Sequence, residues 1–273
     1  NQGIVHPPDS LTITIVNGGV YQHDRDAGRV PKCIWDVGST MYMTGVTGLT
    51  TGDAPEDRDQ DYYNLTFNTP GLLPNLNMDL AGNTIHGDIR VISSGFGRWY
   101  LTSVELPGDS ATVTIMGDVF VEDGTFSVQG TSKAQSTFIV DHYGNINVTG
   151  GNFSISRGSQ GGGTTTWYIH EGDFSMSNAS SNNSTSLAGG ARFVFAKPGG
   201  TQTLSLSNIT YNSTAIPFEV SSTTTLDVGS SPIEGTGIFI LNEGATLATA
   251  HAGGIAGSIQ TGGSITLSDS ANY

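Results

Sequence analysis

The sequence is poor in cysteine and in basic residues, and it lacks long apolar runs. Its single cysteine, Cys33, excludes an internal disulfide and a thiolate metal cluster. Lysine and arginine together number 10 against 24 aspartates and glutamates, which gives a formal charge of −14. This charge repels phosphate groups, so we expect no nucleic-acid partner. No apolar run reaches about 18 residues, so we expect no membrane insertion.

Glycine, by contrast, is abundant, with 38 residues, and serine, threonine and asparagine are also frequent. This composition favours turns over long helices. Charged residues make up only 12% of the chain, so solubility rests on hydroxyl and amide side chains, as in many exported β-proteins. We therefore expect an extracellular or cell-surface location. Because the chain begins with Asn1 and a strand pattern runs up to Tyr273, we also expect a segment of a longer protein.

A repeat runs through the middle of the chain. Its frame is Gly-[Asp/Asn]-apolar-x-apolar, with glycines at 87, 117, 144 and 172, so it recurs every 27 to 30 residues. A glycine followed by Asp or Asn favours a corner with positive φ and a side-chain cap, and the alternation after it predicts a short strand. One corner and two or three strands per repeat predict a right-handed parallel β-helix. In this alignment His142 and His170 share one repeat position.

The repeat also suggests a division of the chain. Residues 1–80 are irregular and are expected to form a β-rich N-terminal cap with the first rungs, while 81–273 form the regular rungs. Later rungs shorten to a spacing of about 20 residues, seen in Thr225–Val228, Thr246–Thr249 and Ile265–Leu267. An immunoglobulin-like sandwich is the rival fold, but it needs more hairpin turns than the sequence offers.

The order of several motifs resembles a group of long secreted proteins of Bacteroidota. These motifs are Leu11–His23, Tyr63–Asn68, Gly150–Ser159, Arg192–Lys197 and Gly244–Thr249. Such proteins carry β-helical bodies ahead of a C-terminal sorting domain for type IX secretion. The resemblance covers nearly the whole chain, and it implies a surface adhesin or an extracellular fibre.

An acidic stretch near residue 57 is the sharpest candidate for a metal site. Alternating carboxylates in a loop can converge on one Ca²⁺ ion, which takes six to eight oxygen ligands. The match to a helix–loop–helix calcium loop is partial, because Tyr62 stands where glycine is expected. The alternative is a solvated acidic loop that Arg58 neutralises in part. The candidate ligands are Asp53, Glu56, Asp57, Asp59 and Asp61.

Two tryptophan–tyrosine pairs, Trp99-Tyr100 and Trp167-Tyr168, are candidates for carbohydrate binding. Strand alternation points one ring of each pair inward and the other outward. The outward ring could stack on a sugar, or it could cover a neighbouring loop.

No residues are singled out as catalytic. His23 beside Asp24-Arg25-Asp26 is interpreted as an ion-paired surface turn, and the acids at the repeat corners are explained by turn capping. The sequence thus predicts an extracellular stalk or fibre, structural or adhesive, whose partners are surface glycans or further copies of itself. The alternative is a polysaccharide lyase, a glycoside hydrolase or a carbohydrate-binding module built on the same coil.

Overall fold

The computed structural model describes residues 13–48, 54–130, 133–157, 161–181, 190–211 and 217–273. Within these ranges the chain is built from short strands joined by turns, with one short helix, α1 (Gly254–Ser258). Every strand pair in these ranges is parallel. Parallel pairing throughout excludes the immunoglobulin-like sandwich, whose sheets are antiparallel.

The described strands form three long parallel sheets and one separate pair. The eight-stranded sheet contains β7 (Thr84–Ile85), β10 (Ser110–Ile115), β13 (Thr137–His142), β16 (Thr164–Ile169), β19 (Ala191–Phe195), β22 (Phe218–Val220), β24 (Phe239–Leu241) and β26 (Ile265–Leu267). The ten-stranded sheet contains β2 (Val20–His23), β4 (Thr40–Met43), β5 (Asn64–Asn68), β8 (Ile89–Ser93), β11 (Val119–Val121), β14 (Ile146–Val148), β17 (Phe174–Ser177), β20 (Thr201–Ser207), β23 (Thr225–Asp227) and β25 (Thr246–Ala248). The six-stranded sheet contains β6 (Asn75–Asn77), β9 (Arg98–Tyr100), β12 (Thr125–Gln129), β15 (Asn152–Ser156), β18 (Ser180–Ser181) and β21 (Thr210–Tyr211). The separate pair is β1 (Ile13–Ile15) with β3 (Cys33–Trp35).

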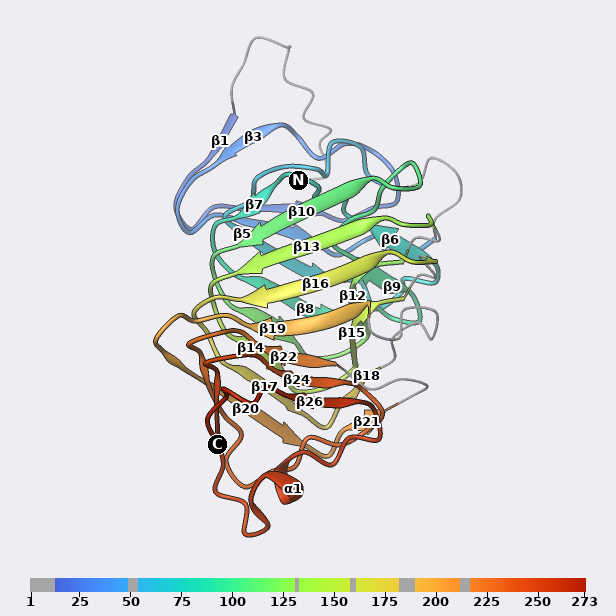
Figure 1. Cartoon of the computed structure of the whole chain (residues 1–273). Coiled ribbons are helices and arrows are strands. Elements are labelled where there is room, and N and C mark those ends of the chain that lie inside the picture. Colours follow the sequence, from blue (N-terminus) through green and yellow to red (C-terminus); the bar gives the residue numbers. More distant parts are fainter. Residues whose placement is uncertain (1–12, 49–53, 131–132, 158–160, 182–189, 212–216) are drawn as a thin grey trace.

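The chain visits the three sheets in turn and then starts again one level further along. β10, β11 and β12 make one such turn, and β13, β14 and β15 make the next, each strand pairing with its counterpart. Figure 1 shows β10, β13, β16 and β19 stacked along the molecule, with the N-terminal strands at one end and α1 at the other. This arrangement confirms the predicted all-β parallel coil, a β-solenoid.

The core is a continuous column of apolar side chains inside the coil. Strand residues alternate between buried and more exposed, as in β10 and β13. Because the turns pair in register, equivalent side chains lie above one another. Trp99 stacks on Phe126 at 4.9 Å between ring centroids, and Phe126 stacks on Phe153 at 5.6 Å. These aromatic contacts stabilise each turn against the next.

The four repeat glycines form a column at the corner between the eight- and ten-stranded sheets. None of them has positive φ, so the prediction of a left-handed corner is wrong. They are needed because the backbones approach too closely for a side chain. A Cβ on Gly144 would lie 2.1 Å from the carbonyl oxygen of Gly117, and one on Gly172 would lie 1.9 Å from that of Gly144.

The Asp or Asn that follows each of these glycines forms a ladder along the coil with Asn64 of the turn before and Thr203 of the turn after, here called the acid–amide ladder. Each side-chain oxygen accepts a hydrogen bond from the backbone N–H of the equivalent residue in the next turn. The prediction that these side chains cap their own turn is therefore wrong, because each of them bonds the next turn. The acceptor-to-donor steps are Asn64 to Asp88 (2.9 Å), Asp88 to Asp118 (2.8 Å), Asp118 to Asn145 (2.7 Å), Asn145 to Asp173 (2.9 Å) and Asp173 to Thr203 (2.7 Å).

The shorter C-terminal rungs arise because the six-stranded sheet ends at β21. Later turns in the described ranges alternate between two sheets only. Thr225 and Thr246 are register partners, as their spacing predicts. Ile265–Leu267, however, pairs with β24 in the eight-stranded sheet, so placing it in the same series was wrong. Strands of both sheets show the same alternation of apolar and polar residues, so the sequence spacing alone could not show to which sheet Ile265–Leu267 belongs.

The N-terminal region joins the coil well before residue 81. β2, β4 and β5 belong to the same ten-stranded sheet as the later rungs, and β5 pairs directly with β8. Only β1 and β3 stand apart, as a pair of their own. None of the described helices is long and apolar enough to span a membrane.

Candidate functional site

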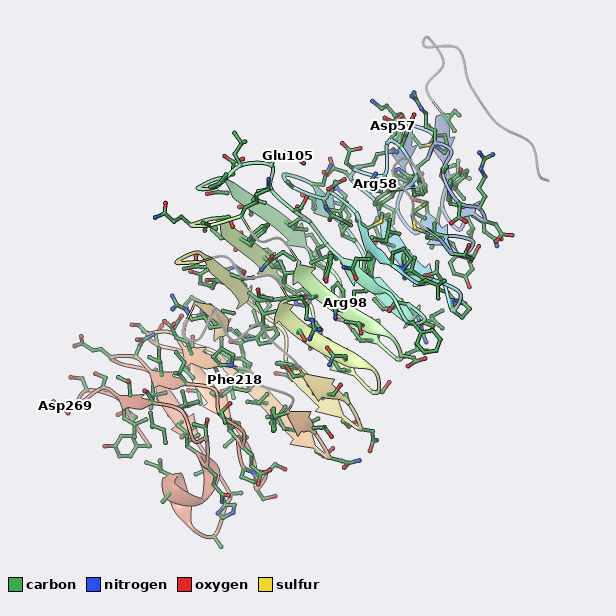
Figure 2. All side chains as sticks on the ribbon, turned by 90° about the vertical axis from the view of Figure 1, so that its right-hand side faces the viewer. Asp57, Arg58, Arg98, Glu105, Phe218 and Asp269 are labelled. Carbon is green, nitrogen blue, oxygen red and sulfur yellow. The ribbon has the colours of Figure 1, made fainter. Side chains whose placement is uncertain are left out.

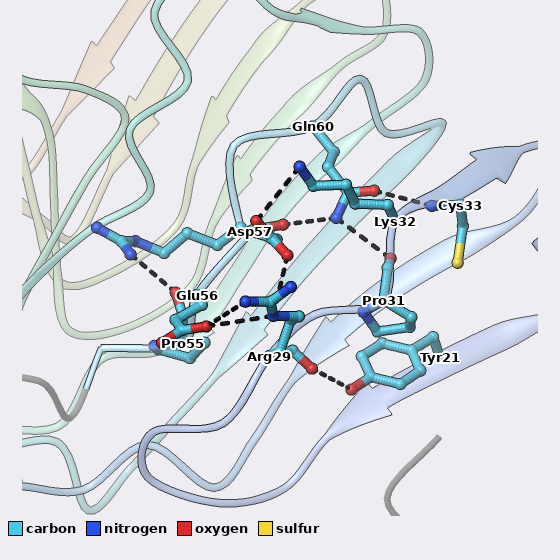
Figure 3. A network of polar contacts seen from close by, with 10 residues as sticks. Tyr21, Arg29, Pro31, Lys32, Cys33, Pro55, Glu56, Asp57 and Gln60 are labelled. Atoms are coloured by element: carbon cyan, nitrogen blue, oxygen red, sulfur yellow. Dashed lines mark hydrogen bonds and ion pairs between the residues drawn. The ribbon is translucent and has the colours of Figure 1, made fainter. Parts of the chain in front are cut away.

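The acidic stretch near residue 57 is part of a network of ion pairs and hydrogen bonds (Figure 3). The carboxylate of Asp57 lies 3.2 Å from Nε of Arg29 and 3.5 Å from Nζ of Lys32. Arg29 also contacts Glu56 at 2.8 Å. Both acids thus already face cations of the chain itself.

Gln60 links this network to the two loops beside it. Its side-chain oxygen accepts hydrogen bonds from the backbone N–H of Cys33 at 3.1 Å and from the indole of Trp35 at 3.2 Å. Its amide nitrogen donates to the carbonyl oxygens of Pro31 and Asp57. The network therefore fastens the irregular N-terminal loops to one another (Figure 3).

The remaining candidate calcium ligands have other surroundings. Asp61 accepts a hydrogen bond from the backbone N–H of Thr84 at 2.6 Å, and Asp59 is exposed. Asp53 lies outside the described residues. In the described part of the chain, no three His, Cys, Asp or Glu side chains are gathered so that they could hold a metal ion. The calcium site and the solvated acidic loop are thus still the two hypotheses for this stretch.

Arg58 does not neutralise the acidic stretch as predicted. Its guanidinium turns away from Asp57 to pair with Asp79, and it also donates to the carbonyl oxygen of Pro55 at 2.8 Å. Figure 2 labels Asp57 and Arg58 near the N-terminal end of the solenoid, far from Asp269 at the other end.

The turn around His23 is held by hydrogen bonds instead of the predicted ion pair. Arg25 donates to the backbone carbonyl of Asp26 rather than to a carboxylate. The Asp26 carboxylate accepts hydrogen bonds from the N–H of Thr47 at 2.7 Å and from its hydroxyl at 2.9 Å. Although burial raises the pKa of Asp26, these bonds outweigh it and lower that pKa. His23 is buried and bonds a backbone carbonyl of the same turn at 2.9 Å.

Three of the four proposed sugar-binding aromatics are not accessible. Trp99 and Trp167 are completely buried and belong to the aromatic core. Tyr100 does point away from the core, but the chain at Gly130 covers it, because a Cβ there would lie 2.3 Å from its ring. These three side chains therefore stabilise the fold. Only Tyr168 is partly exposed.

Tyr168 belongs to a cluster of rings on the outer face of the eight-stranded sheet. The ring of His170 stacks with Tyr168 at 5.9 Å and with Tyr143 at 4.8 Å between centroids. Nε2 of His170 lies 2.8 Å from a carboxylate oxygen of Asp141. Tyr143 is 39% exposed. We call Tyr143, Tyr168 and His170 the outer ring cluster.

Aligning the internal repeats placed His142 and His170 at one repeat position, and the structure shows that this is wrong. His142 is the register partner of Ile169, so one extra residue precedes Gly172 in the later turn. A shift of one residue moves a side chain to the opposite face of a strand. His142 is therefore buried in the core, where Nε2 donates to the carbonyl of Gly117 at 2.8 Å, while His170 lies outside.

An open hollow of about 260 Å³ lies on the ten-stranded sheet, beside the corner that carries the glycine column. The hydroxyl of Ser175 donates to the amide oxygen of Asn147 at 3.1 Å, which orients that amide in the hollow wall. The polar residues that line it are Asn145, Asn147, Asp173, Ser175, Thr203 and Ser205. Carboxylate, amide and hydroxyl groups together offer both hydrogen-bond donors and acceptors.

Sequence analysis missed Tyr143 and this hollow. The available signal was position: Tyr143 and Asn145 flank the repeat glycine Gly144, one on each side. Residues next to a close-packed corner are expected to lie on the outer surface.

The parallel sheets and the stacked turns define the chain as a β-solenoid protein. Comparison with protein-family models, with curated proteins and with solved structures found no match.

Proposed function

We propose that the chain is an extracellular structural or adhesive segment, a stiff β-solenoid stalk or fibre displayed at a cell surface or in a matrix. The acid–amide ladder is the observation that supports this most strongly. It adds a side-chain hydrogen bond to the backbone pairing at each of five successive steps between turns. Because a solenoid turn is held only by its neighbours, such bonds resist bending and shearing along the axis.

Display outside the cell agrees with the surface composition. The outward positions of β20 are Thr201, Thr203, Ser205 and Ser207, all exposed. Uncharged hydroxyl side chains keep such a surface soluble without a high density of charge. The resemblance to secreted Bacteroidota proteins supports the same location and type IX secretion.

The competing function is that of a polysaccharide lyase or hydrolase. It has one observation in its favour, the contact between His170 and Asp141 on an outer face. A histidine oriented by a carboxylate is a common general base.

Product release from polysaccharides tests the two functions. The purified chain is incubated with neutral and acidic polysaccharides, with calcium or with EDTA, and reducing ends and unsaturated products are measured. For a stalk we expect no release above a protein-free blank. Release that is abolished by Asp141→Asn would contradict the structural function and establish the enzyme.

We also propose self-association of this segment into fibres through β26. This strand pairs with β24 on one side only within the described residues, and Ile265 is 45% exposed. An open strand edge with an exposed apolar side chain favours pairing with another copy. Sedimentation velocity at increasing concentration tests this, and Ile265→Lys should shift the distribution toward the monomer. Equal sedimentation distributions for the original chain and for Ile265→Lys would exclude β26 as the site of self-association.

A further inference from the structure

The outer ring cluster and the polar hollow flank the same corner of the solenoid. In one turn only Gly144 separates Tyr143 from Asn145. In the next turn Glu171 and Gly172 separate His170 from Asp173. Gly144 and Gly172 carry no side chain at this corner, and the Glu171 carboxylate beside Gly172 pairs with Lys197 of the following turn. A single extended ligand could therefore contact both.

The rings are held in place rather than free on the surface. Asp141 and Tyr168 are register partners on adjacent strands, and Asp141 contacts Nε2 of His170. Tyr143 and Tyr168 both stack with that imidazole, with interplanar angles of 23° and 17°. A fixed ring loses little conformational freedom when a ligand binds, which favours affinity.

The hollow supplies the complementary polar groups. The Asn147 amide oxygen accepts the Ser175 hydroxyl, so its NH₂ group is oriented by that bond. One carboxylate oxygen of Asp173 accepts the N–H of Thr203 at 2.7 Å, and this fixes the carboxylate in the hollow wall. Oriented amide and carboxylate groups are suited to the hydroxyls of a sugar, each of which donates and accepts hydrogen bonds.

The chemistry selects one class of ligand. Aromatic faces contact the apolar C–H face of a sugar ring, while the polar hollow binds its hydroxyls. The formal charge of −14, together with carboxylates beside both parts of the strip, disfavours a polyanion. We infer that this corner strip, formed by the outer ring cluster and the hollow around Asn147, binds a neutral polysaccharide. This inference rests on the proposed adhesive function and names its partner.

Retention on polysaccharides tests the inference. Binding is measured by depletion on insoluble cellulose, xylan and chitin, and by affinity electrophoresis in soluble neutral β-glucan, alginate and polygalacturonate. We expect retention on at least one neutral polymer. Tyr143→Ala, His170→Ala and Asn147→Ala should each weaken it about tenfold, as expected for residues that dominate a binding surface. Tyr143→Phe, which keeps the ring, should retain most of the binding.

Phe96→Ala is the matched control, because Phe96 is 92% exposed and lies outside the strip. It should leave retention unchanged, and urea unfolding of each variant shows that the fold is intact. Retention on neutral polymers that none of the strip variants weakens would overturn the inference. Retention on acidic polymers alone, or no retention on any neutral polymer, would also overturn it.

The retention experiment and the product-release experiment can fail independently, so the inference and the proposed function are tested separately. Retention that depends on Tyr143 combined with product release would keep the strip and reject the stalk. No product release combined with retention that is independent of Tyr143 would reject the strip and keep the stalk.

Discussion

Asp118 and Asn145, one turn apart, are joined by two hydrogen bonds to a single oxygen. Oδ1 of Asp118 accepts the backbone N–H of Asn145 at 2.7 Å and its side-chain amide at 3.0 Å. Neither bond belongs to the regular strand pairing. The corner therefore carries its own hydrogen bonds between turns, in addition to those of the strands on either side.

Removing the acceptor at Asp118 should destabilise the coil. We expect Asp118→Ala to lower the free energy of unfolding by about 1–2 kcal/mol, because a charge-assisted acceptor of two hydrogen bonds is lost. Asp118→Asn keeps an amide oxygen at the same place and should lose less than half as much. Urea denaturation monitored by circular dichroism measures both. Equal losses for the two variants would mean that the charge, and not the hydrogen bond, stabilises the corner.

A side chain in the glycine column should be more damaging. Gly144→Ala places a Cβ 2.1 Å from the carbonyl oxygen of Gly117, which forces the backbones of two turns apart. We expect a loss of about 3 kcal/mol in the free energy of unfolding. Gly48→Ala is the control, since a Cβ there meets nothing within 4 Å and its φ is not positive. A small effect at position 144 would show that the column tolerates expansion.

The stability of the protein should fall with acid through His142. Burial lowers the pKa of His142 to about 4, whereas an unfolded histidine titrates near about 6.5. Between these values the unfolded chain binds a proton that the folded chain does not. Stability is thus complete above about pH 6.5 and is lost as the pH falls toward 4, by about 3 kcal/mol in all.

His142→Ile isolates this contribution, because the register partners of His142 are Ile115 and Ile169. The variant should show a flatter stability profile between pH 4 and pH 6.5 in urea titrations. Profiles that stay parallel would assign the acid sensitivity to other groups, such as His23, whose pKa burial also lowers.

The ion pairs of Asp57 lead to a prediction about calcium. We expect the melting temperature to be equal in millimolar Ca²⁺ and in EDTA, because Arg29 and Lys32 already face this carboxylate. Asp57→Asn should lower the free energy of unfolding by about 1 kcal/mol through loss of these partly exposed pairs. A rise in melting temperature with Ca²⁺ that Asp57→Asn abolishes would instead establish the calcium site.

The sequence predicts the coil well because its signal is periodic. The glycines from Gly87 to Gly172 mark one corner of each turn, and the alternation after them marks one strand. The structural reason for those glycines was not predictable. They are needed because the backbones of successive turns approach closely, and rules that relate a residue to its own φ angle do not describe such contacts. Ile265–Leu267 was placed in the wrong series of strands because the alternation of apolar and polar residues in a strand does not show which strand it pairs with.

The candidate site was predicted less well. Local alternation predicted that one ring of the Trp167-Tyr168 pair points inward and the other outward, which the structure confirms, since Trp167 is buried and Tyr168 is partly exposed. It could not predict that the chain at Gly130 covers Tyr100, because that contact joins separate loops. It also missed the one-residue shift that separates His142 from His170, so the outer ring cluster was not foreseen.

The acid–amide ladder also bears on how a chain of this kind could change in length. In each of these turns, the residue after the corner glycine donates its backbone N–H to the turn before and offers a side-chain oxygen to the turn after. At this corner, the hydrogen bonding of any such turn is therefore compatible with that of any other. Duplication of a segment of 27 to 30 residues would add a rung that continues the ladder. Unequal recombination within the repeat should then yield longer and shorter variants that fold.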